Sequence, residues 1–125
     1  EFHTVDMLSH STLPGDADVW WMSQFLDCFS PEQIVAMLTR VAQAMKPGAQ
    51  LCIMELFWDA QKFEAASFSL NATSLYFTCM ANGNSRFYSV EKFSHYLEMA
   101  GFRIEKRLDN LGVGHTLLVC QKIEQ

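Results

Sequence analysis

Three carboxylates in this sequence, Asp6, Asp27 and Glu55, each come just after an apolar stretch. A carboxylate can accept a proton from an acidic hydroxyl group when burial raises its pKa, so such side chains suit general acid–base chemistry. Each one also has a simpler explanation. Asp6 can close its own loop, Asp27 can face the positive end of the next helix, and Glu55 can be a turn residue.

Apolar runs precede all three carboxylates. Residues 2–5 form a short apolar piece, and residues 18–23 and 51–54 are nearly continuous apolar runs. The last two runs are too short to form helices, and their apolar character predicts buried strands.

A helix is predicted between residues 18–23 and residues 51–54. Ser30 and Gln33 form a capping box around Pro31, and apolar residues follow at helical spacing until Lys46-Pro47-Gly48. A strand, a helix and a second strand with short connections predict a right-handed parallel crossover.

The remainder of the chain predicts further helices and a final pair of strands. One or two helices are expected in residues 59–80, with one apolar face that consists of Phe63, Ala66, Leu70, Ser74 and Phe77. Ser89 begins another helix, which ends at Gly101. Residues 102–108 and 115–121 alternate as strands, and their short connection makes the pair antiparallel. The predicted fold class is therefore α/β, with parallel strands and an antiparallel final pair.

This topology brings the three carboxylates to one edge of the sheet. In an open parallel sheet, ligands bind outside the carboxyl ends of the strands, where Asp6, Asp27 and Glu55 are expected. Aromatic side chains surround this edge, either as core residues or as the walls of a flat apolar pocket: Trp20, Trp21, Phe25, Phe29, Phe57 and Trp58.

Composition limits the possible partners. The 125 residues suffice for one domain, half of them are apolar, and the net charge is −5. An acidic chain without a basic patch has no electrostatic reason to bind nucleic acid or anionic lipid. No apolar run approaches the roughly 20 residues of a membrane span. We therefore expect neither nucleic acid nor a membrane as a partner.

The cysteines and histidines are scattered. Cys28, Cys52, Cys79 and Cys120 lie far apart among apolar neighbours, so we interpret them as buried, reduced thiols of a cytoplasmic protein. The four histidines are equally dispersed, and no metal site is predicted.

Several motifs, in this order and spacing, resemble one enzyme family. The segments are 2–8, 17–30, 45–49 and 53–55, and residues 86–91 and 100–102 continue the match. They are similar to the class I S-adenosylmethionine-dependent methyltransferases, and most of all to the small-molecule O-methyltransferases. The resemblance implies a Rossmann-like fold, S-adenosylmethionine as cofactor and methyl transfer to a small molecule, with O-methylation expected.

The resemblance also implies roles for single residues. Asp6 would accept a hydrogen bond from the adenine amino group, Met7 would lie on the adenine ring, and Ser23 would lie near the cofactor. Glu55 matches the acid that orients the family's catalytic histidine, but Asp27 stands at the position of that histidine. A second acid of the family corresponds here to Ser85.

The missing histidine leaves alternatives open. Asp27 serves as the base, or the enzyme works by aligning the methyl donor, or the acceptor differs from that of the family. The competing hypothesis is a non-catalytic module that kept the fold and lost the base. A dinucleotide oxidoreductase would share the topology but fits the motifs less well.

The family's glycine-rich cofactor loop has no counterpart in residues 1–125, and the chain begins at Glu1 without a methionine. The resemblance thus implies a partial domain, the C-terminal half of a methyltransferase fold that continues upstream. A helical dimerisation region would precede it, so a homodimeric parent is expected. The chain alone should bind the cofactor weakly or not at all, and it should expose a sheet edge and apolar surface.

Overall fold

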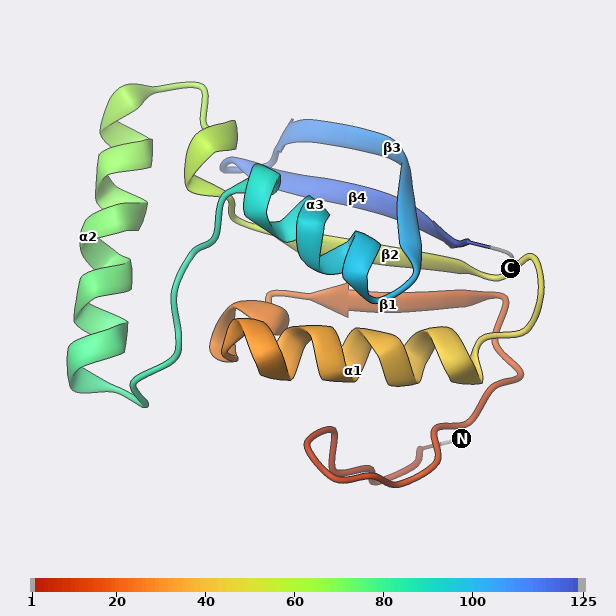
Figure 1. Ribbon diagram of the computed structural model, residues 1–125. Helices are drawn as coiled ribbons and strands as arrows, with labels where there is room; N and C mark the ends of the chain where they lie inside the picture. The colour runs from red at the N-terminus through yellow and green to blue at the C-terminus, as the bar shows by residue number, and fades with distance from the viewer. Residues whose placement is uncertain (1, 124–125) are drawn as a thin grey trace.

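A four-stranded sheet forms the centre of the computed structural model, which describes residues 2–123 (Figure 1). The strands are β1 (Val19–Ser23), β2 (Gln50–Glu55), β3 (Phe102–Leu111) and β4 (His115–Lys122), in the order β1-β2-β4-β3. β1 and β2 are parallel, and β4 runs antiparallel to both β2 and β3. The predicted fold class, with its antiparallel final pair, is confirmed.

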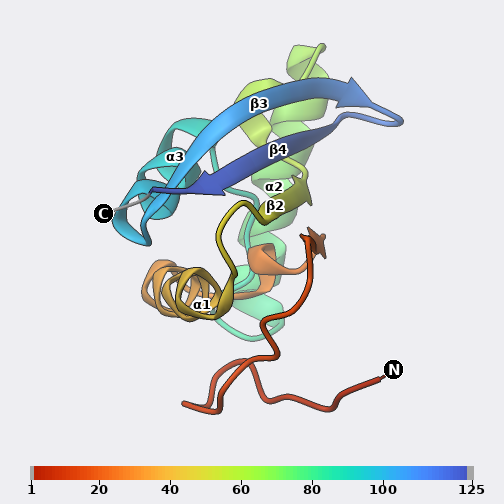
Figure 2. The same cartoon turned by 90° about the vertical axis from the view of Figure 1, so that its right-hand side faces the viewer.

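Two helices cover one face of the sheet, as Figures 1 and 2 show. In α1 (Pro31–Ala44) the predicted capping box is present, because Ser30 Oγ accepts from Gln33 N and the Gln33 side chain accepts from Ser30 N. α3 (Val90–Met99) begins at Ser89, whose side chain accepts from Lys92 N. Both helices bury apolar residues against the sheet, and the buried core includes Ile34, Leu38, Val41, Phe93, Leu97, Leu51, Ile53 and Leu118.

β1 is a strand as predicted, but the prediction that it is buried is wrong. Val19 is 54% exposed and Trp21 is 55% exposed, whereas Met22 is buried. β1 lies at the edge of the sheet, and only the face that carries Trp20 and Met22 packs on the core. An apolar run predicts a strand but not the place of that strand in the sheet. The open sheet edge that the sequence led us to expect is present at β1.

Residues 2–18 form an irregular segment, so the expectation of a strand that ends at Asp6 is wrong. The segment runs beside α1, beyond the β1 edge of the sheet (Figures 1 and 2). Leu13 is buried in the core, and Val5 and Met7 pack partly against it. Arg40 and Lys46 also donate side-chain hydrogen bonds to backbone oxygens of the segment. Asp18 O, at its end, accepts from Gln50 N of β2.

α2 (Glu64–Met80) is one continuous helix, preceded by a short 3-10 turn, Trp58–Ala60. Its expected apolar face is at most half-buried, and no residue of α2 is fully buried. The helix stands beside the sheet rather than on it (Figure 1). Its exposed apolar side chains include Phe68, Leu75, Tyr76 and Met80. No helix within residues 2–123 has the length and apolar character that crossing a membrane requires.

All four cysteines are free, as predicted, but only two are buried. Cys52 and Cys120 lie in the sheet, whereas Cys28 and Cys79 are exposed. Cys28 follows the end of β1 and Cys79 lies near the end of α2, where apolar neighbours in sequence are not neighbours in a core.

Candidate active site

Glu55, the last residue of β2, lies at the centre of the candidate site. Its Oε1 atom accepts two hydrogen bonds, from Phe25 N and Leu26 N, each at 2.9 Å. Gln24 has a left-handed backbone with φ 47°, and Phe25 returns to φ −122° and ψ −48°. Successive N–H groups in such a turn form a concave site for an anion. Here the Glu55 carboxyl group occupies it.

Within residues 2–123 the second oxygen of Glu55 has no hydrogen-bond partner. Glu55 is 2% exposed, and its Oε2 atom is buried without a donor or acceptor. Burial, with a smaller contribution from the negative charge of Asp27, raises the pKa of Glu55 to about 8, although the backbone hydrogen bonds oppose this shift. At neutral pH the folded protein therefore holds Glu55 mostly in its protonated form.

Asp27 lies in the 3-10 turn Leu26–Cys28, directly after the turn that binds Glu55. Its backbone oxygen accepts from Arg86 N at 2.9 Å, which fixes the turn to the segment between α2 and α3. Burial raises the pKa of Asp27, and the Cys28 thiol, whose Sγ donates to Asp27 Oδ1 at 3.6 Å, counteracts the rise. The structure thus brings together two of the three predicted carboxylates.

Residues 82–86 lie beside Asp27. Asn82 Nδ2 donates to Ser85 Oγ at 2.9 Å and to Cys28 O at 3.4 Å. Ser85 also interacts with the Cys28 thiol. Ser85 therefore lies close to Asp27 and Cys28, at the place where the resemblance expects a second acid.

Asp6 does not join the other two carboxylates. It lies in the irregular N-terminal segment, exposed, and its Oδ1 accepts from Leu8 N at 2.9 Å in a local turn. This position matches the simpler explanation, in which Asp6 closes its own loop. The prediction that all three carboxylates share one edge of the sheet is wrong, because the strand needed before Asp6 is absent.

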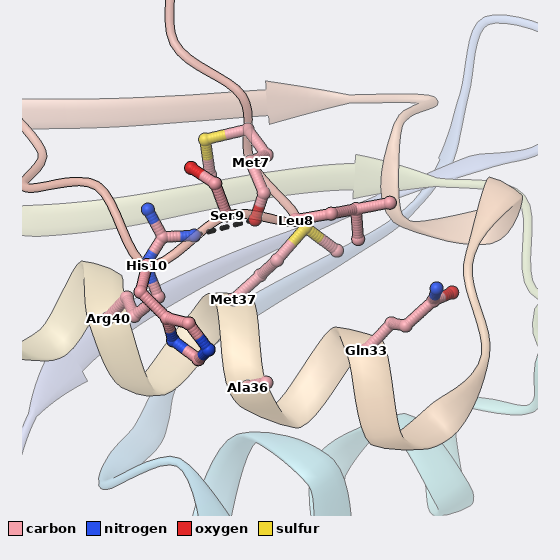
Figure 3. Close-up of a pocket in the computed structure, with 8 residues that line it drawn as sticks. All are labelled: Met7, Leu8, Ser9, His10, Gln33, Ala36, Met37 and Arg40. Carbon is pink, nitrogen blue, oxygen red and sulfur yellow. Dashed lines mark hydrogen bonds between the residues drawn. The ribbon is translucent and has the colours of Figure 1, made fainter.

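Met7, by contrast, lines a cavity. Figure 3 shows the residues that line this cavity: Met7 comes from the N-terminal segment, and Met37 and Arg40 come from α1. The cavity has a volume of about 160 Å³. Arg40 Nη1 donates to Met7 O and Arg40 Nη2 to Ser11 O, each at 2.6 Å, so one guanidinium group holds the segment.

Ser23 is the last residue of β1 and is half-buried. It pairs with Met54 of β2 and therefore lies at the same end of the sheet as Glu55. It faces the opposite side of the sheet from Glu55, because alternate residues of a strand point to opposite faces.

Gln24 and His115 are two residues that the sequence did not single out as site residues. The Gln24 side chain is hydrogen-bonded to the His115 ring through the two Nε2 atoms. His115 precedes Thr116, which pairs with Glu55 in the sheet. The antiparallel pairing of β2 with β4 brings the start of β4 to the end of β2, and no local signal in the sequence indicates this pairing.

Comparison with known proteins places this site in a family. A model that describes the O-methyltransferase domain matches residues 1–103, most of the chain. The chain belongs to this O-methyltransferase domain family. The membership confirms the resemblance inferred from the motifs, and it puts Asp27 and Glu55 within the matched part.

Two curated relatives show the range of the family. The chain is 29% identical over 97 residues to the mitomycin biosynthesis 6-O-methyltransferase of Streptomyces lavendulae. The matched residues make up 78% of this chain and 26% of the relative. It is 29% identical over 92 residues to a protein of Dictyostelium discoideum named "Probable inactive O-methyltransferase 11". The matched residues make up 73% of this chain and 26% of that relative. The chain thus spans about a quarter of the length of these relatives.

A solved structure shares the fold. The structure titled "PigF with SAH" superimposes with a TM-score of 0.78 at 21% identity, over 95% of this chain and 38% of that one. At this identity the likeness establishes the fold: a mixed sheet with one parallel pair and an antiparallel final pair.

Proposed function

We propose that the full-length protein transfers a methyl group from S-adenosylmethionine to a hydroxyl oxygen of a small molecule. The observation that carries the proposal is the Asp27–Glu55 pair, which combines a partly buried carboxylate with a buried carboxyl group at the carboxyl ends of β1 and β2. Membership of the O-methyltransferase domain family supports the reaction class.

In this proposal the chain contributes the acceptor side of the site. When bound, S-adenosylmethionine supplies an electrophilic methyl group on a sulfonium. Asp27 would take the proton of the acceptor hydroxyl, so that the hydroxyl oxygen could accept the methyl group. Burial makes Asp27 a better base than a solvated carboxylate, because its pKa is raised. Glu55 orients the Asp27 turn through the Phe25 and Leu26 amides.

The cofactor side is supplied by fewer residues of this chain. Met7 fits one face of the adenine ring, because its side chain lines a cavity beside α1. One carboxylate oxygen of Asp6 is used by the Leu8 amide, which leaves the other for the adenine amino group, and Ser23 is the third contact. We propose that a glycine-rich loop from the rest of the domain completes the site. This fits the share of its relatives that the chain spans.

The setting of the enzyme is part of the same proposal. We place it in the cytoplasm, where its four free thiols stay reduced, and we propose a homodimer for the full-length protein.

Titration calorimetry with S-adenosylhomocysteine tests the cofactor. We expect micromolar binding to the full-length protein and little or no binding to the 125-residue chain. Absence of binding to the full-length protein would contradict the proposal and favour a non-catalytic module that kept the fold.

Replacement of Asp27 tests the base. Asp27→Asn in the full-length protein should lower kcat by about 100-fold or more, because an asparagine side chain cannot accept the proton of the acceptor hydroxyl. The affinity for S-adenosylhomocysteine should stay the same. Asp16→Asn, a change at an exposed aspartate of the N-terminal segment, is the matched control. Unchanged turnover in Asp27→Asn would exclude Asp27 as the base.

A further inference from the structure

One side-chain hydrogen bond spans the edge of the sheet at which the candidate site lies. Gln24 Nε2 donates to His115 Nε2, and the two residues are 91 positions apart in the chain. Gln24 follows the last residue of β1, and His115 is the first residue of β4. Because β2 lies between β1 and β4, the bond crosses the end of β2, where Glu55 stands.

Gln24 is also a point of backbone strain. Apart from glycine, only Gln24 and Asn110 have a positive φ angle within residues 2–123. A residue other than glycine keeps such a conformation only where its surroundings enforce it, and these conformations cluster at functional sites. At Gln24 the conformation turns the chain so that the next two amides, Phe25 N and Leu26 N, meet Glu55 Oε1.

The partner of Gln24 is itself held in place. Gln61 Nε2 donates to Phe57 O at 2.8 Å and to Gly114 O at 3.0 Å, which ties the turn before β4 to the segment after β2. Gly114 has φ 107° and lies so close to the Gln61 side chain that a Cβ atom there would collide with it. His115 thus projects from a fixed turn and can hold Gln24 in its strained conformation.

We propose that Gln24 and His115 are positioning residues that lock the turn carrying Asp27 onto the carboxyl group of Glu55. His115 fixes the Gln24 side chain, Gln24 fixes the direction of the Phe25 and Leu26 amides, and these amides hold Glu55. Asp27 follows directly on this turn, so its place relative to Glu55 depends on the same bond. The kinetic part of the inference rests on the proposed methyl transfer, whereas its geometric part does not.

A double-mutant cycle in the full-length protein tests the pair. Gln24→Ala and His115→Ala should each lower kcat by about 10- to 100-fold, because small displacements of reacting groups cost rate, and should leave S-adenosylhomocysteine affinity unchanged. The double variant should be no slower than the slower single variant, since both changes break one bond. His115→Gln, which keeps an acceptor near the Nε2 position, should recover most of the rate. Additive losses, or no recovery, would overturn the proposal.

Amide NMR separates this inference from the proposed function. The Phe25 and Leu26 amide resonances should shift in Gln24→Ala and His115→Ala and return towards their wild-type positions in His115→Gln, with the α1 resonances unmoved as evidence of folding. His95→Ala, at an exposed histidine of α3, is the control. If the Phe25 and Leu26 resonances did not move, the proposal that Gln24 and His115 position these amides would be wrong, regardless of the kinetic results. An inactive wild-type protein that shows the expected shifts would instead refute only the methyl transfer.

Discussion

Glu55 and Asp27 are held by hydrogen bonds between residues far apart in the sequence. Asp6 is held by its sequence neighbours, and Met7 is held through a hydrogen bond from the side chain of Arg40. Glu55 accepts from amides 29 and 30 positions away, and the backbone of Asp27 accepts from Arg86. Asp6 accepts from Leu8 and from the side chain of Ser9, within one turn.

This difference separates the proposed acceptor side, which is preorganised, from the proposed cofactor side, which is loosely held. Bonds between distant elements form only when the whole sheet forms, so the acceptor side is as stable as the fold. The N-terminal turn depends on Arg40 and a few apolar contacts, so it can open while the sheet stays intact. Substitutions on the two sides should therefore differ in size and in kind.

The largest expected effect is at Glu55. Glu55→Leu leaves the Phe25 and Leu26 amides buried without an acceptor and should lower the free energy of unfolding by about 2–4 kcal/mol. Glu55→Gln keeps an oxygen at the same place and should cost about 1 kcal/mol or less. Denaturant titration measures both, with Glu91→Gln on the exposed surface of α3 as control. Equal losses in the two Glu55 variants would contradict the idea that an acceptor oxygen at this position holds the turn.

The free energy of unfolding should depend on pH because of the raised pKa of Glu55. Its pKa is about 8 in the folded protein against an ordinary value of 4.5, so between these values the folded protein binds more protons than the unfolded chain. Its contribution is therefore fully present below pH 4.5, and it is lost as the pH rises to about 8, with a slope of at most about 1.4 kcal/mol per pH unit. Unfolding titrations across this range should be flatter in Glu55→Gln. An unchanged slope would mean that another group dominates.

A smaller and more local effect is expected at Arg40. Arg40→Ala removes both hydrogen bonds to the N-terminal segment and should lower the free energy of unfolding by about 1 kcal/mol, with faster hydrogen exchange at Leu8 and Ser9. Arg40→Lys should not recover the protection, because an ammonium group does not span two carbonyl oxygens as a guanidinium does. Arg103→Ala, at an exposed residue of β3, is the control. Loss of protection throughout the sheet would contradict the idea of two separately held sides.

Local signals predicted the elements well. Helix ends are set by residues within about one turn of the end, here Ser30, Ser89 and Gly101. The helix boundaries that these residues predict agree with the structure. The same holds for the short connection between β3 and β4, which made the pair antiparallel. These signals depend only on neighbouring residues, so a single sequence suffices to interpret them.

Properties that depend on distant residues escaped prediction. The exposure of Trp21 follows from the place of β1 at the sheet edge, and the loop around Asp6 follows from the absence of a strand partner for residues 2–5. Glu55 was identified as a site residue, but its bonds to the amides of Phe25 and Leu26 became visible only in three dimensions. The Gln24–His115 bond joins residues whose types carry no local motif.

The turn around Glu55 is built from backbone amides, which almost any residue can provide. The side chain at position 27 can therefore change without dismantling the scaffold that presents it. A different side chain at this position would alter which proton the site can take, but the architecture around it would need no redesign. Such a position lets evolution exchange the chemistry of an enzyme at little cost to its folding.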